Sequence, residues 1–238
     1  MNLILFDRAV AKFILPNDDP RVSHIRDVLR MRPGQRFDVA AVNGPHGKAT
    51  LLEDVPEGLI LAFEWESSAR NDLHPIRLLI GLPRPQTARK ILEQAATMGV
   101  SFIHFFGAEK GEPSYADSKL WKTDEWMRHL RRGVEQAFCS FLPEVHHSRN
   151  LGAALADLPP EPRRLALDPY ESHAPLAKAV QKEDKEYLVA IGPESGWASL
   201  ERDLLREAGF ELLHMGKRVL RQETACVAAL GILSQRWW

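Results

Sequence analysis

The sequence predicts an α/β protein whose parallel sheet is covered by helices on both faces, preceded by a small β-rich domain. Two apolar runs, Glu186–Ile191 and Phe210–Met215, are too short for helices and stop directly at Gly192 and Gly216. Such runs are typical of buried parallel strands that end in loops. From residue 76 onward strand-like runs alternate with helical patterns, and this alternation is the signature of a parallel sheet.

The first 66 residues read as short strands around one helix. The helix begins at Asp19-Pro20, with proline at its first position, and ends at the turn Met31–Gly34. Asn43–Gly47 is a strong hairpin connector. The expected strands are 2–6, 12–15, 35–42, 49–55 and 59–65. A small antiparallel barrel with one inserted helix fits this order.

Residues 67–75 are polar, lack any periodicity and end in a proline, so they are the expected linker. We therefore expect two domains, 1–70 and 71–238. Residues 107–123 form a long polar loop. The strands expected in the second domain are 76–82, 100–106, a short one at Val145, 164–167, 186–191 and 210–215. The expected helices are 86–98, 124–138, 151–158 and 223–235.

Composition narrows the function classes. The net charge is −1 over 238 residues, so a nucleic-acid surface has to be local. Cys139 and Cys226 lie far apart with no ligand-like spacing, which argues against a disulfide scaffold and a metal site and fits a reducing compartment. No signal peptide or run of membrane-spanning length is present. We expect a cytoplasmic protein without a membrane partner.

The two glycine-bearing loops, at 192–197 and 216–221, organise the functional hypothesis. Ligands of open α/β sheets bind outside the carboxyl ends of strands, so we expect these loops to form two walls of one pocket. Lys217, Arg218 and Arg221 crowd the second loop, and Glu223 and Thr224 open the helix that follows. The alternative is a set of solvated charges on a tight turn.

A second group of cations lies on the first helix and its exit. His24, Arg26, Arg30 and Arg32 fall within nine residues, and Arg36 follows. Arg26 and Arg30 would be neighbours on an α-helix. Arginine forks match phosphate oxygens, so this group is a candidate RNA-binding patch. A solvated helix face explains the same pattern.

The loop motifs also carry a family resemblance. GPESGW at 192–197 and MGKRVLRQETA at 215–225 resemble the paired signatures of the SPOUT methyltransferases. The closer resemblance is to the RsmE-type enzymes, which methylate N3 of a uridine in small-subunit ribosomal RNA. HIRDVLRMRPGQ near the N-terminus and Glu135-Gln136 with Leu142-Pro143 resemble further motifs of that family. The resemblance covers nearly the whole chain, and the final loop-and-helix motif is its specific part.

The resemblance implies an N-terminal PUA-like β-barrel that helps to bind RNA. It also implies a C-terminal SPOUT domain with a deep trefoil knot, S-adenosylmethionine bound in that knot, and a homodimer. The implied cofactor residues are Leu167, Ile191, Gly192, Pro193, Glu194, Gly196, Met215, Gly216, Val219, Leu220 and Thr224. Thr224 is a cofactor hydrogen-bond donor or only a helix-start hydroxyl. No metal is implied.

Three residues are catalytic candidates. Removing the N3 proton of uracil spreads negative charge over two carbonyl oxygens, which calls for a cation. Arg221 is the first choice to hold that charge or an adjoining phosphate. Arg218 is the second, with a backbone-facing role as its rival. Glu223 either accepts a proton, orders an arginine or caps the helix.

Four positions depart from the family pattern: Ser195 replaces a glycine, Gln94 a lysine, Met98 a glutamate and Cys139 an arginine. They bear on the RNA target more than on methyl transfer.

Three rival functions stay open. One is a SPOUT enzyme acting on transfer RNA or another ribosomal base. The second is a non-catalytic RNA-binding assembly factor. The third is a dinucleotide oxidoreductase, for which the sequence lacks GxGxxG after its first strand.

Overall fold

The computed structural model describes residues 3–181 and 183–237, and they form two compact units. The first unit contains residues 1–72 and 134–142, and the second contains 73–133 and 143–238. The sequence-predicted strand start at Asn2 lies outside the described residues. Among the described residues, no helix combines the length and apolar character needed to cross a bilayer.

The first unit is a five-stranded sheet in the order β1-β3-β4-β5-β2. Its strands are β1 (Ile4–Phe6), β2 (Lys12–Pro16), β3 (Arg36–Ala41), β4 (His46–Val55) and β5 (Gly58–Trp65). The prediction of an all-antiparallel barrel is wrong, because β1 pairs with β3 in parallel while the other pairs are antiparallel. The long connection from β1 through β2 and the helix to β3 allows this parallel pair. The hairpin connector is also shorter than predicted, since β4 begins at His46.

The inserted helix is shorter and less regular than its sequence pattern predicts. A single α-turn, α1 (Pro20–Ser23), is capped by Asp19 and runs into a π-helical segment, η1 (His24–Val28). The Leu29 N–H donates to the His24 carbonyl, five residues back. Arg30 lies beyond the helix with a φ of 52°. Arg26 and Arg30 are therefore not neighbours on one α-helical face, as the spacing had suggested.

The second unit is a seven-stranded parallel sheet in the order β10-β12-β9-β11-β6-β7-β8. Its strands are β6 (His74–Gly81), β7 (Val100–Phe106), β8 (Glu144–Ser148), β9 (Arg163–Leu167), β10 (Ala174–Pro175), β11 (Tyr187–Ile191) and β12 (Glu211–His214). Its helical segments are α2 (Pro85–Thr97), η2 (Pro113–Asp117), α3 (Lys119–Lys122), α4 (Glu125–Gln136) up to Gly133, α5 (Leu151–Ala156), α6 (Leu176–Ala179), α7 (Ser199–Glu207), α8 (Gln222–Leu233) and η3 (Ser234–Arg236). The predicted parallel α/β architecture is confirmed.

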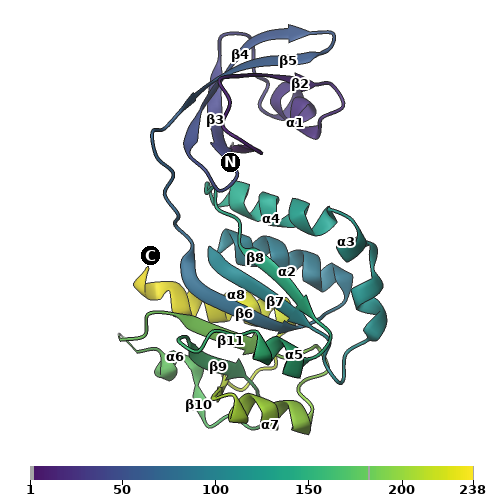
Figure 1. Ribbon diagram of the computed structural model, residues 1–238, viewed down its shortest axis with the longest axis vertical. Coiled ribbons are helices and arrows are strands. Elements are labelled where there is room, and N and C mark those ends of the chain that lie inside the picture. Colours follow the sequence, from purple (N-terminus) through teal and green to yellow (C-terminus); the bar gives the residue numbers. More distant parts are fainter. Residues whose placement is uncertain (1–2, 182, 238) are drawn as a thin grey trace. The chain divides into compact units, whose positions relative to one another are not determined.

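Helices cover both faces of this sheet (Figure 1). Leu188 and Ala190 of β11 belong to one core cluster with Leu151 of α5 and Leu205 of α7. Side chains alternate along a strand, so Tyr187, Val189 and Ile191 point to the opposite face. There α2 and α8 pack against each other, and α8 contacts β11. All five residues of β11 are buried, which explains the continuous apolar run in the sequence.

The order of the strands reverses between β6 and β11. The chain leaves β6 through α2 to reach β7 on one side, and it leaves β11 through α7 to reach β12 on the other. Such a switch point opens a crevice at the carboxyl ends of the two central strands. The functional site is therefore expected beyond Gly81 and Ile191.

A buried ion pair fixes the end of β9. Asp168, 1% exposed, accepts a hydrogen bond from the Arg202 side chain of α7, and its other oxygen accepts the Tyr170 N–H at 2.7 Å. Arg202 is 8% exposed, so little water reaches the pair. Loss of the arginine would leave a buried carboxylate without its counter-charge.

Replacing Arg202 with methionine should therefore lower the free energy of unfolding by about 3–5 kcal/mol. The matched control is Arg206→Met on the same helix, because Arg206 is an exposed residue paired with Glu171 and Asp203. Its loss should change stability far less than the loss of Arg202, because exposed ion pairs contribute little. Urea unfolding measures both, and equal effects of the two substitutions would contradict the role given to the pair.

A buried histidine predicts a pH-dependent stability. His104 of β7 is 2% exposed, and its Nε2 lies 2.8 Å from Ser148 Oγ. Burial, and next the neighbouring His146, hold the pKa of His104 below its ordinary value, against an opposing effect of Asp157. The folded protein thus takes up this proton at lower pH than the unfolded chain does.

Between the folded pKa and the unfolded pKa of about 6.5 the unfolded chain binds more protons, so the free energy of unfolding falls as the pH is lowered through this window. His104→Gln keeps a polar partner for Ser148 and cannot titrate. The Tm of the variant should fall less than that of the wild-type protein between about pH 7.5 and pH 5.5. Parallel Tm curves for the two proteins would show that His104 is not responsible.

Candidate active site

One cavity lies at the carboxyl ends of three adjacent strands. β9, β11 and β12 are parallel neighbours, so the loops that follow Leu167, Ile191 and His214 meet at one edge of the sheet. The cavity has a volume of about 170 Å³. Its lining includes every cofactor residue predicted from the sequence except Thr224: Leu167, Ile191, Gly192, Pro193, Glu194, Gly196, Met215, Gly216, Val219 and Leu220. Thr224 is exposed on the first turn of α8.

Two of the cavity glycines have a clear physical reason. A Cβ on Gly192 would lie 3.0 Å from the ring of Trp197, whose Nε1 donates to the Leu167 carbonyl at 2.9 Å. The backbone of the first loop therefore packs against the buried Trp197 ring, which lines the cavity. Gly216 has a φ of 97°, a conformation that favours glycine. Ser195, the departure in this loop, donates from its hydroxyl to the Lys110 carbonyl at 2.7 Å.

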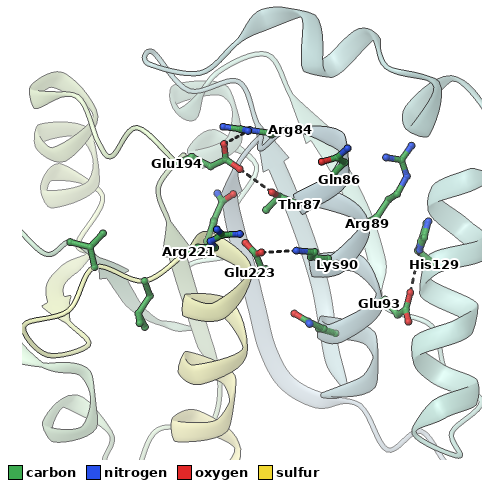
Figure 2. Close-up of a pocket in the computed structure, with 14 residues that line it drawn as sticks. Arg84, Gln86, Thr87, Arg89, Lys90, Glu93, His129, Glu194, Arg221 and Glu223 are labelled. Carbon is green, nitrogen blue, oxygen red and sulfur yellow. Dashed lines mark hydrogen bonds and ion pairs between the residues drawn. The ribbon is translucent and has the colours of Figure 1, made fainter.

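A second, larger hollow adjoins the cavity. It has a volume of about 920 Å³ and we call it the basin. The basin lies over the starts of α2 and α8 and shares Glu194 and residues 219, 220 and 222 with the cavity (Figure 2). The residues that line it are Arg84, Gln86, Thr87, Arg89, Lys90, Glu93, Gln94, His129, Glu194, Val219, Leu220, Arg221, Gln222 and Glu223.

Most of the charged groups in the basin are already paired. Glu194 accepts hydrogen bonds from Arg84 Nε and Thr87 Oγ1, both at 2.9 Å (Figure 2). The carboxylate of this predicted cofactor residue therefore engages the basin wall. Arg89 pairs with Glu125, Lys90 with Glu223 and His129 with Glu93. Arg84, Thr87 and Lys90 were not identified from the sequence, because only tertiary packing brings them to Glu194 of the first loop and Glu223 of α8.

Arg221 is the exception among these cations. It is exposed and lines the basin, and its guanidinium has no hydrogen-bond or ion-pair partner in the described part of the chain. Arg218, the second candidate, is also exposed but lines the cavity. The structure thus separates the two arginines, with Arg221 on the basin side and Arg218 on the cavity side.

Glu223 serves a structural purpose that the sequence analysis only partly anticipated. Its Oε1 accepts a hydrogen bond from Lys90 Nζ at 3.0 Å, so the cation it orders is a lysine of α2. Burial acts to raise the pKa of the carboxyl, yet hydrogen bonds from its own amide and from Lys90 hold that pKa below its ordinary value. A carboxylate with a lowered pKa is a poor proton acceptor, which leaves helix capping and the Lys90 contact.

Gln222 is the functional residue that the sequence analysis missed. It is 5% exposed, and its Nε2 donates to the carbonyls of Gly81 and Gly192, each at 2.7 Å. These carbonyls follow β6 and β11, the two strands at the switch point. A glutamine between Arg221 and Glu223 reads as a surface residue, so no local signal in the sequence indicates its burial.

The predicted RNA-binding residues of the first unit differ in their exposure and in whether their side chains form ion pairs. Arg26 pairs with Asp54 and also donates to Asn17 Oδ1 at 2.8 Å. Arg30 and Arg32 are exposed, and no side-chain ion pair involves them among residues 3–181 and 183–237. His24 is half-buried. Free cationic groups in this segment are therefore concentrated at the helix exit.

Two further departures, Gln94 and Cys139, and the motif residue Glu135 fall in both units. Gln94 lines the basin. Glu135 Oε1 accepts the Leu5 N–H at 3.0 Å within the first unit, which gives it a structural contact. Burial, and next the hydrogen bond with Asp72, raise the pKa of the Cys139 thiol to about 12. The thiolate is therefore scarce at neutral pH, which argues against Cys139 as a nucleophile.

Comparisons with known proteins agree with this geometry. The family model described as an RNA methyltransferase domain matches residues 69–234. A relative from Treponema pallidum named ribosomal RNA small subunit methyltransferase E is 34% identical, over 98% of this chain and 90% of that protein. A relative from Borreliella burgdorferi named ribosomal RNA small subunit methyltransferase E 1 is 26% identical, over 96% and 95%.

Solved structures show the same fold. The ribosomal RNA small subunit methyltransferase E of Neisseria gonorrhoeae, solved with S-adenosylmethionine bound, superposes with a TM-score of 0.81 at 21% identity and covers 100% of this chain and 98% of that one. A protein from Legionella pneumophila, solved with the same cofactor, gives 0.84 at 22% identity over 98% and 97%. The chain therefore belongs to the RNA methyltransferase family that includes the ribosomal RNA small subunit methyltransferases E.

Proposed function

We propose that the protein transfers a methyl group from S-adenosylmethionine to N3 of a uridine in small-subunit ribosomal RNA. The observation that carries the proposal is the junction of two hollows: a glycine-walled cavity at the switch-point edge and a polar basin that shares its wall. The names of the curated relatives support ribosomal RNA as the substrate. The N3 position rests on the family resemblance.

The cavity residues fit a nucleoside cofactor. Backbone groups of the two loops face it without side chains at Gly192 and Gly216, and the exposed ring of Tyr170 lies at its lining. Its volume of about 170 Å³ is below the roughly 300–1,000 Å³ of usual ligand sites. We propose that binding displaces part of the segment 215–221, which lacks helix and strand and exposes 76% of Val219.

S-adenosylmethionine supplies a methyl group that is electrophilic because it is bonded to a sulfonium. The residues of this chain have to hold the uracil so that N3 lines up with that methyl group, since alignment is the main requirement of an in-line displacement. In this proposal Arg221, which lines the basin, holds negative charge on a uracil carbonyl oxygen. This favours loss of the N3 proton without a buried general base.

The paired cations of the basin have a different role from that of Arg221. Arg84, Lys90 and Arg89 already neutralise Glu194, Glu223 and Glu125, so they shape the wall and contribute little free charge. We assign anion recognition in the basin to Arg221. Arg218, on the cavity side, contacts the cofactor in this scheme.

The first unit extends the RNA contact. We propose that it is the PUA-like barrel of the family and that Arg30 and Arg32, with His24 and Arg26 beside them, bind RNA phosphates. The trefoil knot, the homodimer and a cytoplasmic location are further parts of the proposal that rest on the family resemblance.

Methyl transfer tests the function directly. Tritiated S-adenosylmethionine is incubated with small ribosomal subunits that lack the family's uridine methylation, and the labelled nucleotide is mapped. Label at N3 of one uridine is the predicted result. Label on transfer RNA or on another ribosomal base would instead support the rival hypothesis of a SPOUT enzyme with a different RNA target. Cofactor binding without label on any RNA would contradict the proposed substrate, and no cofactor binding would favour an assembly factor.

Arg221→Ala should lower the rate of this transfer by about 10²-fold or more, the loss expected when a charge-stabilising donor is removed. Cofactor affinity, measured by calorimetry, should stay the same because Arg221 lines the basin and not the cavity. The control is Lys217→Ala, an exposed residue of the same loop that lines neither hollow. Unchanged turnover in Arg221→Ala would remove the role assigned to it.

The double variant Arg30→Ala, Arg32→Ala should weaken binding to small subunits and reduce the slope of log affinity against log salt by about 2, near 1 for each lost phosphate contact. Arg36→Ala is the matched control, since Arg36 is paired with Glu64 at 2.7 Å. A slope that does not change in the double variant would place the RNA elsewhere.

A further inference from the structure

The Gln222 side chain uses only half of its hydrogen-bonding capacity. Both N–H groups of Nε2 are consumed by the carbonyls of Gly81 and Gly192. Because both partners are acceptors, the amide cannot be turned over without placing oxygen against oxygen. The orientation of the amide is thus fixed, and Oε1 is the atom that faces away from the two strand ends.

That oxygen is buried and has no hydrogen-bond partner in the described part of the chain. A buried acceptor without a partner is unfavourable, and native proteins keep few of them. The location is informative, because Gln222 lines both the cavity and the basin. Gln222 therefore belongs to the wall shared by the two hollows, and its buried oxygen brings partial negative charge into that wall.

We propose that Gln222 Oε1 faces the sulfonium group of the bound cofactor and accepts its polarised methyl C–H groups. This inference rests on the proposed function, since it takes a sulfonium cofactor as the ligand. The amide of Gln222 is then a positioning group that directs the methyl group toward the basin. Segment 215–221 has to shift on binding to uncover the oxygen, as the small volume of the cavity also requires.

The chemistry of the acceptor favours the sulfonium over other donors. The N3–H of the substrate is not a suitable donor to Oε1. A hydrogen bond from N3–H would occupy the direction from which the methyl group has to approach N3. A sulfonium makes its methyl hydrogens unusually positive and carries a full charge, so a carbonyl dipole attracts it electrostatically as well as through C–H···O contacts. S-adenosylhomocysteine lacks both the charge and the methyl group.

The test compares the affinities of these two ligands. Gln222→Met keeps the length of the side chain and removes Oε1, and calorimetry gives its Kd for S-adenosylmethionine and for S-adenosylhomocysteine. The preference for the methylated ligand should fall by about three- to fivefold relative to the wild-type protein. Gln235→Met, an exposed glutamine in η3, is the matched control and should leave the preference unchanged.

A structural role alone predicts another result. If Gln222 only ties the strand ends together, both affinities fall by the same factor and the inference is overturned. A failure of the proposed function gives a different result, since the wild-type protein itself would then not bind S-adenosylmethionine.

A second measurement does not depend on the stability of the variant. The methyl group of ¹³C-labelled S-adenosylmethionine is observed by NMR on the wild-type protein, where contact with Oε1 should move its proton resonance downfield from that of the free cofactor. In Gln222→Met this downfield shift should be lost. A bound methyl resonance that is not shifted downfield in the wild-type protein overturns the inference even when the variant does not fold.

Discussion

The insertion of β11 between β9 and β6 is the constraint on which the second unit depends. All five residues of this strand are buried and are paired on both sides, from Tyr187 to Ile191. The insertion brings the ends of β6 and β11 together at the switch point and places the end of β9 beside them. It also leaves two carbonyls, of Gly81 and Gly192, that the Gln222 amide binds. The first residue of α8 is thereby fixed to the centre of the sheet.

Charge pairing then decides what each side of the site can do. In the basin, glutamates neutralise Arg84, Lys90 and Arg89, and Arg221 is left without an ion-pair partner among the described residues. Under the cavity, the buried pair of Asp168 and Arg202 fixes the end of β9. Under the proposed function, the first set of pairs leaves one cation for an anionic substrate, and the second pair holds the edge of the sheet from which the cofactor loops start.

Sequence reasoning predicted the parallel sheet and both loops because buried strands and glycine turns are local signals. The structure gives Gly192 and Gly216 their own physical reasons, the Trp197 ring packed against Gly192 and the positive φ of Gly216. The basin was not predicted, because its contacts join residues far apart in the sequence: Thr87 bonds Glu194 of the first loop, and Lys90 of α2 bonds Glu223 of α8 across 133 residues. Gln222 was missed because its neighbours are charged. In the first unit, the parallel pairing of β1 and the π-helical turn at His24 depend on tertiary context that periodicity does not carry.

A crystal structure of the protein with S-adenosylmethionine tests the central claim most directly. The account predicts the cofactor between residues 191–197 and 213–220, with its methyl group directed at the wall shared with the basin and with Arg221 beyond that wall. Density for the cofactor at another edge of the sheet, or a methyl group directed away from the basin, would contradict the account.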